Sequence, residues 1–215
     1  MFDRAQWFLA GMSIALSVQL SQPVAVAVPV GKVVQIAQTN SRDAAQKVYE
    51  EAEKLYEQGT VEALRGAIVK YEEALKLYRK AGNRSREALT LHNMGGAYLN
   101  LGEQQKALEY YSQSLPLRRA VDDRGGEAVT LSSMAFVKRS LSNFTEALTD
   151  IEASLKLIEN LRSKIAGLES RSSYFATVQD YYKFYIDLLM QLHQANPNSG
   201  YDVKALEARK RAINP

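Results

Sequence analysis

The sequence predicts an all-α protein built as a solenoid of helical hairpins, and two observations support this fold class. From residue 42 onward, apolar residues recur at spacings of three and four, which is the period of an amphipathic helix. Matching residues also return after 40 positions, as at Ala67, Ala107 and Ala147. A fixed repeat of this length indicates an array in which each unit buries its apolar face against the next unit.

The first segment of the chain, residues 1–27, has the pattern of a secretory signal peptide. The letters "MFDR" precede the apolar run "AQWFLAGMSIALSVQL", and Ala25-Val26-Ala27 has the small-x-small form of a cleavage site. The run is shorter than the roughly 20 residues that span a bilayer. We therefore expect an exported protein of the periplasm or cell envelope, which begins near Val28 and has no stable membrane span in the mature chain.

Two alternatives to cleavage stay open for this segment. It could be retained as an uncleaved membrane anchor, or it could be an apolar tail of a cytoplasmic protein. Residues 28–41, which follow, are expected to form a flexible linker ahead of the repeats.

The repeats are predicted at about residues 42–81, 84–121 and 124–168, each as two helices joined by a short turn. The turns within the units are marked by Gly59, by "LGEQ" at residues 101–104 and by "LSNF" at residues 141–144. The segments "KAGNRS" and "AVDDRGG" separate the units, because glycine and asparagine stop helices. Within the middle unit, Gly95 is expected to face Ala107 and to let the two helices approach closely.

Residues 169–215 are predicted to form C-terminal capping helices and a tail. In "SSYFATVQDYYKFYIDLLMQL", a wide apolar face contains Phe175, Val178, Tyr182, Tyr185, Leu189 and Leu192 at helical spacing. The simpler interpretation is a helix that covers the exposed end of the last repeat, since solenoids require caps. The alternative is a docking face, from Phe175 to Leu192, for an absent domain or a second chain.

Composition sets limits on function. The 215 residues are 46% hydrophobic and 24% charged, which is typical of a globular domain. A net charge of +3, from 27 basic and 24 acidic residues, argues against nucleic acid as a partner. The chain has no cysteine, which excludes disulfides, thiolate nucleophiles and Cys-based metal sites.

The repeats resemble a known family. In "LHNMGGAYLNLGEQQKALEYYSQSL", the residues Met94, Gly95, Tyr98, Gly102, Ala107 and Tyr111 fall in the pattern of a tetratricopeptide repeat. The resemblance implies a right-handed α-solenoid of about three such hairpins with a 40-residue period, similar to the longer repeats of kinesin light chains. Lys138 and Gln104 depart from the pattern, because an aromatic residue is usual at both positions.

The run also resembles the tetratricopeptide regions that precede caspase-like CHAT protease domains in cyanobacterial proteins. The segments "QGTVEALRGAIVKYEEALKLYR" and "SSYFATVQDYYKFYIDLLMQLHQANPNSGYDVKALEA" are similar to the junction with that domain. A caspase-like enzyme needs a cysteine beside a histidine, and this chain has no cysteine. His92 and His193 lack partners at catalytic or metal-ligand spacing, so we expect no enzyme activity, no metal and no cofactor.

The first helix of each hairpin is expected to line a concave groove, as in other stacked helical hairpins. The residues predicted to face this groove are Tyr49, Glu53, His92, Asn93, Gly96, Asn100, Ser132, Ser133, Phe136 and Arg139. A polar groove with aromatic residues suits a peptide, whose backbone Asn93 and Asn100 could hold. The carboxylate clamp of chaperone-binding tetratricopeptide domains is disfavoured, because His92 and Gly96 replace its Lys and Asn.

The expected function is therefore a non-enzymatic scaffold or adaptor that binds a protein or peptide partner. The alternative is a detached regulatory module, or truncated N-terminal module, of a CHAT-type protease.

Overall fold

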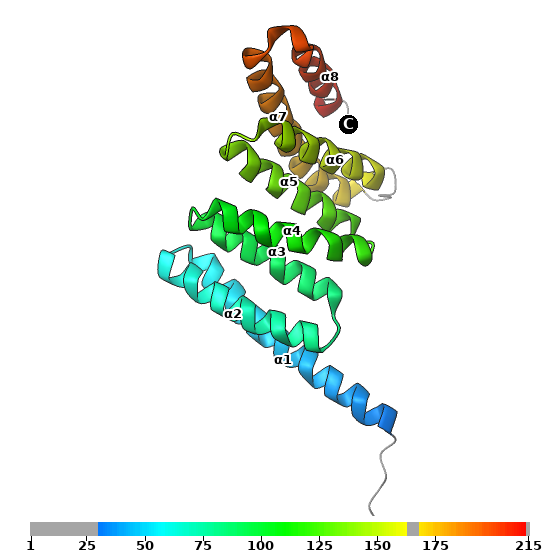
Figure 1. Cartoon of the computed structure of the whole chain (residues 1–215). Coiled ribbons are helices and arrows are strands. Elements are labelled where there is room, and N and C mark those ends of the chain that lie inside the picture. Colours follow the sequence, from blue (N-terminus) through cyan, green and yellow to red (C-terminus); the bar gives the residue numbers. More distant parts are fainter. Residues whose placement is uncertain (1–29, 163–167, 214–215) are drawn as a thin grey trace, which may run out of the picture.

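A computed structural model describes residues 30–162 and 168–213, and every regular element in this part of the chain is helical (Figure 1). In chain order the α-helices are α1 (Val30–Gln58), α2 (Val61–Lys80), α3 (Arg84–Asn100), α4 (Gln104–Ala120), α5 (Arg124–Ser140), α6 (Phe144–Arg162), α7 (Leu168–Ala195) and α8 (Tyr201–Ile213). A 3₁₀ helix, Pro197–Ser199, lies between α7 and α8. The predicted all-α class is confirmed.

The helices pair in chain order, α1 with α2, α3 with α4, α5 with α6 and α7 with α8. Figure 1 shows these hairpins stacked one after another from the blue end of the chain to the red end. Ala67, Ala107 and Ala147 lie at the same place in successive hairpins, and each is fully buried. The 40-residue period therefore corresponds to the stacking of hairpins, as the sequence predicted.

The helix ends repeat every 20 residues. Each of four turns contains one residue with positive φ, followed by an N–H that donates to the carbonyl oxygen five residues earlier, as in a Schellman motif. The residues with positive φ are Gly82, Gly102, Asp122 and Ser142. Asp122 and Ser142 thus hold a left-handed conformation that glycine adopts more easily.

Two arginine–glutamate pairs join neighbouring hairpins at equivalent positions. Arg79 Nε lies 2.7 Å from Glu87 Oε1, and 40 residues later Arg119 Nε lies 2.6 Å from Glu127 Oε1. The side chain of Glu127 is only 6% exposed, and Arg124 Nη1 also approaches it at 3.2 Å. Each pair connects the second helix of one hairpin to the first helix of the next.

A contact between the two helices of a hairpin is aromatic in the second repeat and ionic in the third. The rings of Tyr98 and Tyr110 are stacked, with centroids 5.1 Å apart and planes 8° apart. Forty residues later, Lys138 Nζ lies 2.7 Å from Asp150 Oδ2 at the same place between the two helices. The departure of Lys138 from the expected aromatic residue is therefore matched by a second change, at position 150.

The nearest neighbours of Gly95 add to the expected contact with Ala107. A Cβ built on Gly95 would have as its nearest neighbours three ring atoms of Tyr111, at 2.7, 2.7 and 3.1 Å. The missing side chain therefore makes room for an aromatic ring of the facing helix, which is 2% exposed.

The N-terminal part differs from the sequence prediction in one respect. Helix α1 begins at Val30, so residues 30–41 are helical where a flexible linker was expected. The predicted signal peptide, residues 1–27, lies outside the described residues. Within the described residues, none of the helices has the length and apolar character that crossing a membrane requires.

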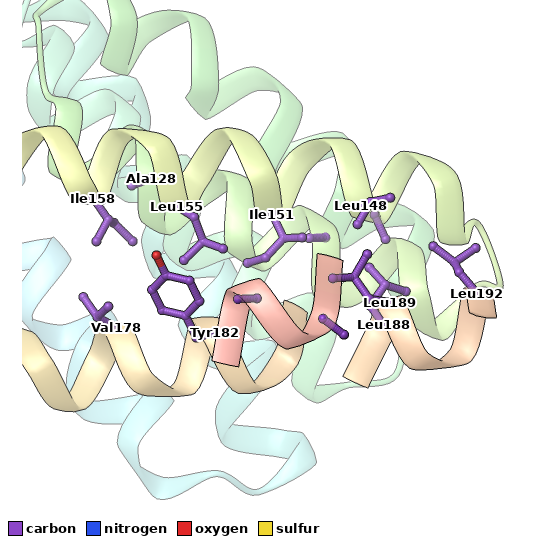
Figure 2. Close-up of a cluster of buried hydrophobic side chains, with 14 residues drawn as sticks. Ala128, Leu148, Ile151, Leu155, Ile158, Val178, Tyr182, Leu188, Leu189 and Leu192 are labelled. Carbon is purple, nitrogen blue, oxygen red and sulfur yellow. The ribbon is translucent and has the colours of Figure 1, made fainter. Parts of the chain in front are cut away.

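The C-terminal helices cover the end of the third repeat. Figure 2 shows Ile158 and Leu155 of α6 facing Val178 and Tyr182 of α7, and α8 contributes Ala205 and Ala208 to the same cluster. Val178, Tyr182, Leu188, Leu189 and Leu192 are each at most 7% exposed. The predicted cap is present, and these five side chains are buried in it, whereas Tyr185 of the same face is only partly buried and lines a pocket. The side chain of Phe175 lies outside the described residues.

Candidate partner-binding groove

The first helices of the three repeats, α1, α3 and α5, contact one another through polar side chains along one face of the stack. Asn93 and Asn100 of α3 reach α1, and His92 of α3 reaches α5. Arg139 of α5 extends the series by donating from Nε to Gln191 Oε1 of α7, at 3.2 Å. We call this surface of α1, α3, α5 and α7 the groove face.

The N-terminal third of the groove face is a closed hydrogen-bond network. Asn93 Nδ2 donates to Tyr49 Oη at 2.6 Å and to Glu53 Oε1 at 2.9 Å, and the hydroxyl of Tyr71 donates to the same Glu53 oxygen. Burial, together with Glu53, raises the pKa of Tyr49. Tyr49 is 6% exposed, so its expected role as an accessible groove residue is wrong. Tyr49, Glu53 and Asn93 hold α1 against α3.

The middle of the groove face surrounds a neutral histidine. His92 Nδ1 lies 3.2 Å from Thr130 Oγ1, and its ring centroid lies 5.0 Å from that of Tyr111. Burial, assisted by the charge of Arg118, lowers the pKa of His92 to about 4. The imidazole is therefore uncharged at neutral pH and holds α3 to α5 in its neutral form.

Gly96 and Asn100 share one partner. A Cβ on Gly96 would lie 3.2 Å from Tyr56 Oη, and the same hydroxyl accepts a hydrogen bond from Asn100 Nδ2 at 3.1 Å. The absence of a side chain at Gly96 leaves space for the Tyr56 hydroxyl. Asn100 itself is exposed, and its amide oxygen has no hydrogen bond within the described residues.

The C-terminal third contains a pocket of about 400 Å³ between α5 and α7. Its lining residues are Leu99, Ser132, Ser133, Phe136, Ile151, Asp180, Tyr181 and Phe184. Phe136 is 54% exposed, and its ring centroid lies 6.2 Å from that of Phe184. The pocket is thus walled by aromatic side chains from two helices that are distant in the sequence.

The two serines predicted for the groove are satisfied within their own helix. Ser132 Oγ and Ser133 Oγ each donate to the carbonyl oxygen of Val129, at 2.9 and 3.0 Å. Arg139 is also engaged, since its guanidinium carbon lies 5.3 Å from the ring centroid of Phe184. The part of the pocket that these residues offer to a ligand is therefore mainly apolar.

Sequence reasoning missed the contribution of α7 to this pocket. Asp180 and Phe184 line it at a spacing of four, and Gln191 continues the same stripe of the helix. Phe184 also packs against the apolar cluster that α7 shares with α6 and α8, so the pocket borders this cluster. The spacing was present in the sequence, but nothing indicated that α7 would lie beside α5.

The described residues offer little to a metal ion, since no group of three or more His, Asp or Glu side chains lies together among them. His92 lies on α3 and His193 on α7, where His193 Nδ1 is 3.7 Å from Asp202 Oδ1.

Comparison with known proteins agrees with the repeat architecture. Residues 66–120 match the family model described as "Tetratricopeptide repeat". No curated protein sequence matches the chain. This match supports the predicted repeats in the middle of the chain.

Three solved structures have a similar fold at low sequence identity. Aspartyl phosphate phosphatase F from Bacillus subtilis is 13% identical, with a TM-score of 0.60 over 80% of this chain and 41% of that protein. Kinesin-light-chain-like, nearly identical TPR-like repeats from Podosopora anserina are 14% identical, with a TM-score of 0.50 over 80% and 90% of the two chains. A STAND protein with a tetratricopeptide repeat sensor, from Pyrococcus horikoshii, is 18% identical, with a TM-score of 0.50 over 75% and 25%.

The chain therefore spans less than half the length of the phosphatase and a quarter of the STAND protein. At these identities the likeness concerns the fold alone.

Proposed function

We propose that this chain is a non-enzymatic interaction scaffold that binds a peptide or partner domain along the groove face. The observation that carries the proposal is the pocket of about 400 Å³ beside an aromatic side chain, Phe136, that is 54% exposed. A large apolar group in such a position is typical of a binding surface. The tetratricopeptide match at residues 66–120 supports a protein as the partner.

The internal hydrogen bonds of the groove face also support this proposal. Asn93, His92 and Arg139 are engaged with neighbouring helices, so the surface is held in shape before a ligand arrives. A preformed surface loses less conformational entropy on binding than one that must be ordered. The groups that remain available for contact are Asn100, Phe136 and the pocket beside it.

A selection from a random 12-residue peptide library on the purified protein tests the proposal. Peptides that bind should lose affinity when Phe136 is replaced by Asp, and should keep it when Val69 of α2, which is also exposed, is replaced by Asp. Val69, at 62% exposed, lies on a second helix of a hairpin and serves as the matched control. Failure to enrich any peptide, or equal loss in both variants, would contradict a groove-based scaffold.

The proposal includes export to the periplasm or cell envelope, supported by the signal-peptide pattern of residues 1–27. Expression of the full chain in a bacterium with two membranes, followed by fractionation and intact mass, tests this part. A periplasmic species that begins near Val28 is expected. A full-length cytosolic or membrane-bound species would contradict cleavage.

The alternative, a regulatory module of a CHAT-type protease, is supported by the sequence resemblance of the segments at residues 58–79 and 172–208. Its test is whether the purified chain binds a separately encoded CHAT domain and alters its rate of peptide hydrolysis. Binding that depends on Phe136 would unite the two proposals. No change in rate and no binding would leave the independent scaffold.

A further inference from the structure

The pocket between α5 and α7 contains a single charged lining residue. Among its eight lining residues, Asp180 alone carries a charge at neutral pH, and the others are aliphatic, aromatic or hydroxyl-bearing. Asp180 is exposed, and within the described part of the chain no ion pair involves it. The pocket is thus an apolar site with one carboxylate at its edge.

Arg139 of α5 and Lys183 of α7 form no ion pair with this carboxylate. Arg139 is occupied by the ring of Phe184 and by Gln191. Lys183 follows Asp180 by one helical turn and is exposed, but it forms no ion pair with Asp180. Asp187, on the same stripe of α7, adds a second exposed carboxylate. An incoming positive charge would therefore meet carboxylates that have no partner within the described residues.

We propose that this pocket takes one apolar side chain, aromatic or aliphatic, from a peptide that carries Lys or Arg within a few residues of it. This inference rests on the proposed scaffold function and defines the chemistry of its partner. The volume of about 400 Å³ lies within the range of ligand sites, roughly 300–1,000 Å³, and is lined mainly by apolar and aromatic groups. Phe136, Tyr181 and Phe184 contact the apolar group, and Asp180 pairs with the basic residue.

The two contacts differ in strength. An aromatic residue at the centre of an interface is a frequent hot spot, so Phe136→Ala is expected to weaken binding tenfold or more. An ion pair at an exposed site contributes little to affinity, because water and salt screen the two charges. Asp180→Asn is therefore expected to weaken binding about threefold, and its main effect is on which peptides are chosen.

The probes are labelled 12-residue peptides, each with one central Trp, Phe or Leu and with Arg, Gln or Glu two positions away. Their affinities for the full chain are measured by fluorescence anisotropy, at low and high salt. Control variants are Leu206→Ala of α8, which is 56% exposed and so comparable with Phe136, and Glu72→Gln, which removes an exposed carboxylate of α2 outside the pocket. Circular dichroism confirms that each variant is folded.

Support for the inference consists of three results. The Arg peptides bind more tightly than the Gln and Glu peptides, and the advantage decreases with salt. Phe136→Ala removes binding, whereas the two controls retain it. Asp180→Lys reverses the preference, so that the Glu peptides become the tighter ligands.

Two results would overturn the inference without overturning the scaffold. Equal binding of Arg, Gln and Glu peptides would show that Asp180 does not select charge. Peptides from the random library that bind, but do so independently of Phe136 and Asp180, would place the binding site elsewhere. A chain that binds no peptide in the library would instead contradict the proposed function itself.

Discussion

The ring of Tyr111 fills the space that a side chain at Gly95 would need. A Cβ at position 95 would lie 2.7 Å from Tyr111 Cδ1 and 2.7 Å from Cε1, both of which are atoms of a rigid ring. Tyr111 is 2% exposed, and its ring also lies against His92 on the groove face. A glycine in the interior of α3 therefore sets the position of an aromatic residue of α4 and, through it, the middle of the groove.

The first prediction concerns this contact. Gly95→Ala gains about 0.5–1 kcal/mol of helix stability but forces Tyr111 to move, and overpacking of a core costs about 1–3 kcal/mol. We expect a net loss of about 1–2 kcal/mol in urea unfolding. The control is Gly66→Ala of α2, whose Cβ would lie at an ordinary 3.4 Å from Leu55 Cδ1 and should be neutral or stabilising. Equal stability of the two variants would contradict the proposed role of Gly95.

A second prediction follows from the turn at Ser142, where φ is 64°. A side chain in the left-handed region is strained, whereas glycine adopts it freely. Ser142→Gly should therefore stabilise the protein by about 0.5–1 kcal/mol, measured as a higher urea midpoint. Gly102→Ser, at the equivalent turn, should lower the midpoint by a similar amount. A loss of stability in Ser142→Gly would mean that the left-handed backbone conformation of Ser142 is not strained.

The third prediction tests the exchange of an aromatic pair for an ion pair. Lys138→Tyr removes the cation from Asp150, whose side chain is only 14% exposed, and should destabilise the fold by more than about 1 kcal/mol. Asp150→Tyr should cost less, because Lys138 also lies 3.3 Å from Glu146. The double variant places tyrosines at both positions, as in the equivalent stacked pair of Tyr98 and Tyr110. We expect it to be more stable than the sum of the single changes by about 1 kcal/mol, and additivity would refute the equivalence.

The fourth prediction concerns pH. The pKa of His92 is about 4 in the fold, below the value of about 6.5 in an unfolded chain, so the unfolded chain binds the proton first. The stability that neutral His92 contributes is complete above pH 6.5 and is lost as the pH falls from about 6.5 towards 4. Since one pKa unit corresponds to about 1.4 kcal/mol, the loss is of the order of 3 kcal/mol.

Proton NMR of the two histidine rings measures this value directly, and His92→Gln provides the control. The resonance of His92 should shift only below about pH 5. The stability of His92→Gln should change less than that of the native chain between pH 6.5 and 4. Titration of His92 near pH 6.5 would show that water reaches the ring and that burial does not control its charge.

The repeat architecture could be predicted because similar residues are buried at equivalent positions of each hairpin. Ala67, Ala107 and Ala147 are fully buried at the same place in three successive hairpins, and their period of 40 residues predicts the hairpins. The partner of Gly95 was harder to predict. A small residue can make room for another small residue or for a large ring, and the pattern of one helix does not distinguish these cases.

The candidate site was less predictable for a related reason. Periodicity indicates that Tyr49, Asn93 and Phe136 lie near the edge of an apolar stripe, but not whether a neighbouring helix covers them. Tyr49 is covered by α3 and Phe136 is not. Asp180 and Phe184 lie about 45 residues from Phe136 in sequence, and only the path of α7 in space brings them to the same pocket.

Because α7 both closes the end of the solenoid and walls the pocket, ligand occupancy and the docking of the terminal hairpin are thermodynamically linked. The pocket exists only in molecules whose α7 lies against α5, so transient opening of the last hairpin empties it. A bound peptide would shift that equilibrium towards the docked state and slow the exchange of the amide hydrogens of α7 and α8. The docked state of the last hairpin would then become more stable as the concentration of the ligand increases.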